Sequence, residues 1–436
     1  MKRILLAVLL IGYLADDVHS QTWSNVGNGL DWNVYDLITF DDTLYAAGRL
    51  GAPSRGVFYW DGTDWVNTSY FWGIFSPLTL AEYNNDLYTS GDFNGNNGDP
   101  TRVFKWTGES WEKQGDNFTG GDWNSVKKLL THEGFLYAGG QFEIADGIAC
   151  KNIARWDGTN WTPVSTGIPD LIVNMDVLNN NLIVNHIITD FSNNPNTNPY
   201  IRQKLQVLEN NIWVDLDSVF EYKNIHLIGV IEDQLYFSTY DTISGIPING
   251  LGVWNGNTFS SLGSDLIYSV NDITKFNNEI YISSLLYTDV QAVFDDVVLK
   301  KVNNSWESIG GVFDNRLLKL HVHDSNLYAA GFFKEYENIQ MPYVAQLVQK
   351  PTALFEIEVN IINFYPNPFK EDITVISENH PIRQIELFSI QGKSLMNWNF
   401  DNRNEIELKL QGLPNGVYNL ILTTSNGVQH RKIIKH

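Results

Sequence analysis

The stretch Trp60-Asp-Gly-Thr-Asp-Trp65 recurs along the chain and decides the fold. Close copies span residues 106–111, 156–161 and 254–259, and degraded copies span residues 208–213 and 301–306. Every copy keeps a glycine or an asparagine at the position of Gly62, and these residues tolerate positive φ. A tight turn between two antiparallel strands needs such a residue, so each copy predicts a β-hairpin.

The copies define a long internal repeat. With the second aromatic residue of each copy as the mark, and Trp23 as its first occurrence, the marks fall at 23, 65, 111, 161, 213, 259 and 306. A second signature, Leu-Tyr followed by small residues, recurs inside the units, as at Leu44 to Gly48. Together with the flanking apolar segments, these signatures give four strands per unit, which is typical of a propeller blade. We therefore predict an all-β protein with a seven-bladed β-propeller over residues 21–350; six or eight blades remain alternatives, because residues 162–213 are irregular.

The ends of the repeat array predict how the ring closes. The last unit ends near Gln349 without an outer strand of its own, whereas residues 23–27 have the outer-strand pattern and no unit of their own. We predict that residues 23–27 complete the last blade. The units resemble the broad kelch or galactose-oxidase-like propeller group, a resemblance of architecture that carries little information on function.

Composition and charge exclude several classes of function. Trp, Tyr and Phe make up 13% of the 436 residues, which favours strands. The formal net charge of -21 repels phosphate backbones, so we expect no nucleic-acid partner. Cys150 is the single cysteine, which excludes an internal disulfide and Cys-rich metal sites. We expect neither a metal nor another cofactor.

The first residues have the pattern of a secretory signal peptide. Lys2 and Arg3 precede an apolar run that is too short to span a membrane, so we expect no transmembrane segment. Val18 and Ser20 are small enough for the -3 and -1 positions of a signal peptidase site. We predict cleavage between Ser20 and Gln21, which removes residues 1–20.

The repeat stops before residue 361, and a different set of motifs follows. The segment contains a Tyr-Pro-Asn-Pro opening, a Gly-Lys turn, a Gly-x-Tyr strand start and a basic last strand. These motifs resemble the type A sorting domain of type IX secretion substrates. The residues that carry the resemblance are Tyr365, Pro366, Asn367, Pro368, Gly392, Lys393, Gly416 and Tyr418.

The resemblance implies a route and a partner. A type IX-like secretion machinery would recognise residues 361–436 after passage through the periplasm, remove them, and leave the protein extracellular or on the outer-membrane surface. Alternating apolar positions in this segment predict a small seven-strand Ig-like β-sandwich. Residues 351–360 would then be the linker.

Candidate ligand-binding residues lie in the crossovers between units. Crossovers and the loops between the second and third strands share one face of a propeller, opposite the tight turns, and ligands are expected there. Aromatic rings beside carboxylates suit sugar rings. The alternative is that these aromatic residues only pack between blades. The crossover aromatics are Trp32, Tyr70, Phe71, Trp72, Trp123, Tyr222 and Tyr268.

Histidine offers weaker signals. His132 and His323 occupy a strand-end position that other units fill with apolar residues, so we expect both in the core. His321 and His323 could share a strand face and bind a metal, which is the less favoured alternative.

Three functions stay open from the sequence. The first is a secreted or cell-surface module that binds an extracellular glycan or protein. The alternatives are a polysaccharide-active hydrolase or lyase and a structural envelope component. No Ser-His-Asp order or paired-carboxylate spacing stands out, so we expect a binding module rather than an enzyme.

Overall fold

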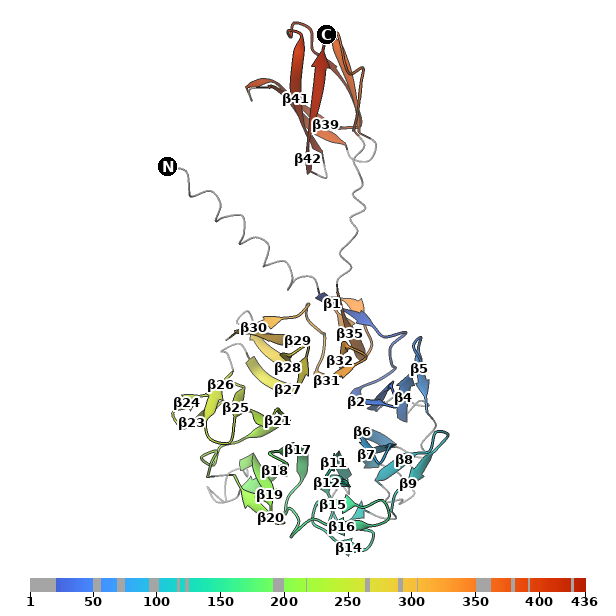
Figure 1. Cartoon of the computed structure of the whole chain (residues 1–436), viewed down its shortest axis with the longest axis vertical. Coiled ribbons are helices and arrows are strands. Elements are labelled where there is room, and N and C mark those ends of the chain that lie inside the picture. The colour runs from blue at the N-terminus through green and yellow to red at the C-terminus, as the bar shows by residue number, and fades with distance from the viewer. Residues whose placement is uncertain are drawn as a thin grey trace. The chain divides into compact units, whose positions relative to one another are not determined.

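The computed structural model describes residues 21–49, 56–68, 75–93, 102–115, 118–121, 125–190, 200–216, 218–262, 267–288, 293–303, 305–349, 362–377, 381–390, 393–424 and 427–436. All regular elements in these ranges are β-strands, which confirms the all-β class (Figure 1). The chain forms two compact units, divided between Gln349 and Lys350. The predicted signal peptide and linker lie outside the described residues.

The described part of the first unit contains seven antiparallel sheets of four strands. In Figure 1 the sheets surround a common centre, with β2, β6, β11, β17, β21, β27 and β31 innermost, which is a β-propeller. From the innermost strand outward, the sheets are β2 (Val34–Phe40), β3 (Thr43–Gly48), β4 (Gly56–Trp60), β5 (Trp65–Asn67); β6 (Phe75–Tyr83), β7 (Asp86–Phe93), β8 (Val103–Trp106), β9 (Trp111–Lys113); β11 (Ser125–His132), β12 (Phe135–Gln141), β15 (Ile153–Trp156), β16 (Trp161–Pro163); β17 (Ile172–Leu178), β18 (Asn181–Asp190), β19 (Tyr200–Glu209), β20 (Ile212–Asp215); β21 (His226–Ile231), β22 (Gln234–Ser238), β25 (Gly252–Trp254), β26 (Phe259–Ser261); β27 (Ile267–Phe276), β28 (Glu279–Thr288), β29 (Val293–Val302), β30 (Ser305–Ser308); and β31 (Leu317–His323), β32 (Asn326–Gly331), β35 (Val344–Gln349), β1 (Gln21–Asn25).

The recurring motif forms the predicted outer hairpin. Trp60 pairs with Trp65 across the turn between β4 and β5, and Gly62 has a φ of 94°. In the degraded copies Asn210 and Asn303 take φ values of 49° and 55°, so asparagine replaces glycine without loss of the turn.

The ring closes through the N-terminal strand. β1 pairs with β35 in antiparallel register, with Trp23 opposite Leu347. The prediction that an N-terminal strand completes the last sheet is confirmed, but its bounds were wrong: the strand is Gln21–Asn25, not 23–27. Gly27 has a φ of 60°, which breaks the extended backbone and ends the pairing. β1 therefore begins at the residue that signal cleavage is predicted to leave as the new N-terminus.

The core lies between neighbouring sheets. One cluster joins Leu37 and Leu44 of the first sheet to Tyr328 and Val344 of the last. Other clusters likewise join adjacent sheets, so each sheet buries both faces, and its strands are apolar on both sides.

Three short hairpins were not predicted. They lie between the second and third strands of alternate sheets, where the segments are too short to show a period. They are β13 (Ile144–Ala145) with β14 (Ile148–Ala149); β23 (Thr242–Ile243) with β24 (Ile246–Pro247); and β33 (Glu335–Tyr336) with β34 (Ile339–Gln340). On its other side β13 pairs with β10 (Phe118–Thr119).

The second unit has the seven predicted strands, arranged in two antiparallel sheets. One core cluster contains residues of both sheets, such as Ile373 and Leu420, so the sheets form a sandwich. The Ig-like topology stays a prediction. The sheets are β36 (Ile362–Tyr365), β37 (Asp372–Ser377), β40 (Glu405–Lys409); and β39 (Ser394–Arg403), β38 (Ile382–Ser389), β41 (Gly416–Thr424), β42 (Gly427–Lys435). Within the described residues, no helix could cross a membrane.

Candidate functional site

Two adjoining cavities occupy the centre of the propeller. Their volumes are about 340 and 380 Å³, and the innermost strands line both. They share the side chains of Asp36, Lys128, Met175, Asp176 and Lys319. The centre is thus a polar, charged space of the size that small ligands occupy.

A β-bulge precedes three of these residues, Asp36, Lys128 and Lys319. Each innermost strand has an irregular register in its first half, as between Val34 and Asp36 and between Val126 and Lys128. A bulge re-aims the residue that follows it. The residues after the bulges are Asp36, Thr79, Lys128, Asn174, Gly229, Asp272 and Lys319.

The channel carboxylates join neighbouring sheets. Asp36 is 8% exposed, and its Oδ1 accepts the N–H of Leu37 at 3.0 Å while its Oδ2 accepts the N–H of Leu80 in the next sheet at 2.9 Å. Asp176 does the same with Val177 at 2.8 Å and Val230 at 2.7 Å. Backbone N–H groups that face the channel thereby gain acceptors they would otherwise lack.

Two asparagines of the innermost strands also contact the next sheet. Nδ2 of Asn174 donates to the carbonyl of Leu227 at 3.0 Å, and Nδ2 of Asn271 donates to the carbonyl of Leu317 at 2.8 Å. Several polar residues at the bulges are therefore structural as well as channel-lining.

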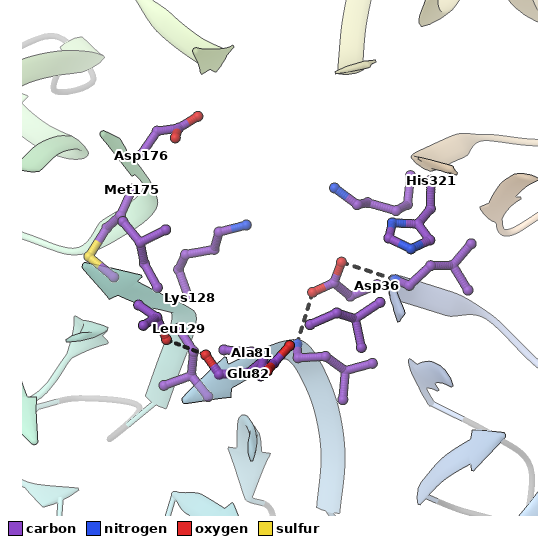
Figure 2. A pocket seen from close by; sticks show the side chains of 14 residues that line it. Asp36, Ala81, Glu82, Lys128, Leu129, Met175, Asp176 and His321 are labelled. Carbon is purple, nitrogen blue, oxygen red and sulfur yellow. Dashed lines mark hydrogen bonds between the residues drawn. The ribbon is translucent and has the colours of Figure 1, made fainter. Parts of the chain in front are cut away.

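The two shared lysines differ in their surroundings. Nζ of Lys319 lies 3.3 Å from Oδ2 of Asp272. Burial alone would lower the pKa of the Lys319 ammonium, but Asp272, Asp36 and Asp176 together hold that pKa above its usual range. Lys128 has no hydrogen bond or ion pair within the described ranges, and Figure 2 shows its side chain projecting into the cavity. The Lys128 ammonium is thus available to a ligand.

Burial also changes the proton affinity of Asp176. It raises the pKa of the Asp176 carboxyl above its ordinary value, against the lowering effect of the N–H groups of Val177 and Val230. The nearby ammonium groups of Lys128 and Lys319 also lower the pKa of Asp176, but all the lowering effects together are smaller than the increase caused by burial.

A Thr39 hydroxyl joins the two histidines of β31. Nε2 of His321 lies 2.9 Å and Nδ1 of His323 lies 3.1 Å from Oγ1 of Thr39 in the first sheet. The expectation that His132 and His323 belong to the core was wrong, because both are half-buried and reach the neighbouring sheet; Nε2 of His132 lies 3.1 Å from the carbonyl oxygen of Asn180. The part of the chain that is described holds no group of three His, Cys, Asp or Glu side chains placed to bind a metal.

The pKa of His321 predicts an acid-sensitive contact. Burial is the largest effect on this pKa, and the Lys319 ammonium is the next; both lower it. Asp36 raises it, and the net result is a decrease from 6.5 to about 4. Between these two pH values the unfolded chain binds more protons than the folded one, so stability falls as pH decreases through this window. The full shift corresponds to about 3 kcal/mol, and partial exposure reduces it to about 1–2 kcal/mol.

We therefore expect His321→Asn to lose less stability than the wild type between pH 7 and pH 4. Urea unfolding at both pH values measures the difference. An equal loss in the two proteins would show that His321 does not contribute.

The predicted crossover aromatics are only partly described. Trp32 and Tyr222 are 45% and 67% exposed and lie before β2 and β21, in sheets that are not neighbours in the ring. Glu221, next to Tyr222, is used structurally, since its Oε1 accepts the N–H of Ser244 at 2.9 Å. Tyr70, Phe71, Trp72 and Trp123 lie outside the described residues, as does the side chain of Tyr268.

Sequence reasoning missed the channel residues. A signal was present: a polar residue precedes an apolar one in most innermost strands, as in Asp36-Leu37 and Lys128-Leu129. The bulge hides it, because a strict two-residue alternation does not continue across an inserted residue.

In the second unit, the Pro-Asn-Pro segment holds the last strand. Oδ1 of Asn367 accepts the N–H of Ile434 at 2.9 Å, and its Nδ2 donates to the carbonyl of Lys432 at 3.3 Å. The Tyr418 hydroxyl donates to the carbonyl of Pro414 at 2.5 Å. Of the predicted sorting residues, Asn367 and Tyr418 thus have structural contacts, whereas Tyr365 is 50% exposed and Gly392 is not described.

Residues 363–436 match the family model of the secretion system C-terminal sorting domain. The chain therefore carries a type IX sorting domain at its C-terminus. Such a domain directs a protein to the type IX machinery and on to the cell surface or the exterior. No curated protein matches the chain.

Solved structures resemble the fold at low identity. YjhT is 15% identical, with a TM-score of 0.37 over 65% of this chain and 99% of that one. The sialidase of Trypanosoma rangeli in complex with the inhibitor DANA is 12% identical, with a TM-score of 0.36 over 93% of this chain and 84% of that one. These scores support no inference about function. The kelch-like character of the repeats stays a prediction.

Proposed function

We propose that the exported propeller is a binding module that takes a carboxylate-bearing glycan into its central channel. The observation that carries the proposal is Lys128, which lies in a polar cavity and whose ammonium has no hydrogen bond or ion pair with any described residue. A carboxylate on the ligand would accept a charge-assisted hydrogen bond from the Lys128 ammonium.

The engaged carboxylates favour binding over catalysis. Both oxygens of Asp36 and of Asp176 accept backbone N–H groups. A nucleophile or general base needs a carboxylate free to approach the substrate, and these two carboxylates are held by the strands.

The charge of the whole chain restricts the ligand. A net charge of -21 repels a polyanion at long range, whereas a short ligand with one or two carboxylates can reach a local cation. The hydroxyl groups of a sugar can bond with the polar channel wall, which includes Thr79 and Asn174. Exposed Trp32, which precedes β2, offers a further stacking surface.

The test compares a short uronic-acid oligosaccharide with its methyl ester by isothermal titration calorimetry. We expect the acid to bind and Lys128→Met to weaken binding at least tenfold, because the variant removes a charged hydrogen bond worth about 1.5–3 kcal/mol. Lys334→Met, which changes an exposed lysine, is the matched control. Equal binding of acid and ester, or an unchanged affinity in Lys128→Met, would refute the proposal.

A polysaccharide-cleaving enzyme is the second candidate, and the raised pKa of Asp176 favours it. A general acid in glycoside hydrolysis is a carboxyl with a raised pKa, and burial shifts the pKa of Asp176 in that direction. Release of new reducing ends from the same oligosaccharide, lost in Asp176→Asn, would establish this function instead.

A further inference from the structure

The hydroxyl of Thr79, in β6, is a buried polar group of the central channel. Thr79 is 2% exposed, and its Oγ1 makes no hydrogen bond with any described residue. The residue lines the cavity of about 380 Å³ together with Lys128. A buried hydroxyl without a partner costs free energy, so its presence calls for an explanation.

Backbone contacts fix Thr79 on both sides of its side chain. Its carbonyl accepts the Thr89 hydroxyl at 3.0 Å, and the N–H of the following Leu80 donates to Oδ2 of Asp36 at 2.9 Å. Protein atoms cover Oγ1 itself. Rotation about χ1 exchanges the hydroxyl and the methyl group of threonine between staggered positions, so Thr79 can present its hydroxyl to the cavity that it lines.

The residues that follow the bulges form a ring around the channel, with one residue from each sheet. Gly229 brings no side chain to this ring. Four other members have polar side chains that are already bonded within the protein. They are Asp36, Asn174, Asp272 and Lys319. The remaining two, Thr79 and Lys128, have side chains with no hydrogen bond or ion pair among the described residues.

These two residues belong to neighbouring sheets. In Figure 1, β6 and β11 lie side by side at the centre of the propeller. Ser90, which stands opposite Thr79 in β7, donates through its hydroxyl to the carbonyl of Val126 at 3.3 Å, two residues before Lys128. The two unpartnered donors of the ring are therefore adjacent in it.

We propose that Thr79 and Lys128 bind the same carboxylate of the ligand, each donating a hydrogen bond to one of its oxygens. A carboxylate has two acceptor oxygens, and hydrogen bonds to an ionised acceptor are stronger than neutral ones. The pair distinguishes a uronic acid from a neutral sugar, which has an uncharged hydroxymethyl group at the position of the carboxylate. This inference rests on the proposed function and makes Thr79 a determinant of its specificity.

The test titrates the full chain with the short uronic-acid oligosaccharide and its methyl ester by calorimetry. Thr79→Val keeps the shape of the side chain and removes the hydroxyl. We expect Thr79→Val to weaken binding of the acid about tenfold, because the lost hydrogen bond is made to a charged group. Thr79→Ser keeps the hydroxyl and should bind the acid within about threefold of the wild type. The ester should bind equally to the wild type and to Thr79→Val.

Urea unfolding separates this role from a structural one. Thr79→Val should not lower the urea midpoint, since it removes a buried hydroxyl that has no partner among the described residues. Thr239→Val is the matched control: Thr239 is 6% exposed and lines neither central cavity, and its Oγ1 accepts the N–H of Asp241 at 3.2 Å. This control should lower the midpoint and leave binding of the acid unchanged.

The outcomes distinguish this inference from the proposed function. If the acid binds and depends on Lys128, but Thr79→Val binds it as tightly as the wild type does, the inference is overturned and the proposed function stands. A lower urea midpoint for Thr79→Val would assign the hydroxyl to the scaffold and would also overturn the inference. Absence of binding of the acid by the wild type would overturn both.

Discussion

Trp23→Ala is expected to lower the free energy of unfolding of the propeller by about 3–5 kcal/mol, the usual cost of truncating a buried tryptophan. Trp23 is 3% exposed, although it lies in the outermost strand of its sheet. Its Nε1 donates to the carbonyl of Ile309 at 3.0 Å, and its ring meets Phe313 at a centroid distance of 5.7 Å. The residue anchors β1, and β1 is the strand that joins the two ends of the ring.

Urea unfolding followed by tryptophan fluorescence measures this effect. Thirteen of the fourteen tryptophans lie before residue 350, so the signal reports on the propeller. Trp32→Ala is a matched control, since Trp32 is 45% exposed and its truncation should change stability by less than about 0.5 kcal/mol. Similar changes in the two variants would mean that β1 does not hold the ring closed.

For the same strand, β1, the sequence predicts the pairing correctly but not the strand bounds. Pairing of β1 with β35 was predictable, because an outer-strand pattern without a unit and a unit without an outer strand can only complete each other. The strand bounds were not, because Gln21 and Thr22 carry no apolar alternation; they join the strand by backbone pairing with Gln349 and Val348. Repeats thus determine topology more reliably than they determine strand ends.

The candidate site was harder to predict than the fold. Trp32 and Tyr222 were found by residue type, and both are exposed on crossovers. Lys128 and Asp36 were missed, because each repeat places a different side chain after its bulge and no motif recurs among them. Their proximity arises only when the ring closes around a centre, which no local pattern encodes.

The charge on Asp36 illustrates how the ring and the channel depend on one another. Its carboxylate accepts N–H groups from two neighbouring sheets while it lines the cavity. It is also one of the acids that hold the pKa of Lys319 above its usual range. One residue therefore supports the scaffold and the electrostatics of the channel.

Asp36→Leu should accordingly lower the free energy of unfolding by about 2–6 kcal/mol, because two buried N–H groups lose their acceptor at about 1–3 kcal/mol each. Leu37 and Leu80, which carry these groups, are 2% and 5% exposed, so water cannot easily replace the carboxylate. Asp36→Asn keeps one acceptor oxygen and should lose roughly half as much. Urea unfolding measures the loss of stability in both variants. Hydrogen exchange at the amide of Leu80 should be faster in both, and faster in Asp36→Leu than in Asp36→Asn.

Asp31→Leu provides the matched control, five residues earlier in the crossover. Asp31 is exposed and should tolerate the change within about 0.5 kcal/mol. If Asp36→Leu were as stable as this control, the Asp36 carboxylate would not join the first two sheets. The same structural role, assigned to Asp176 from the same kind of contacts, would then be in question. Both channel acids would then be free for chemistry on a bound glycan, and the case for an enzyme would strengthen at the expense of the binding module.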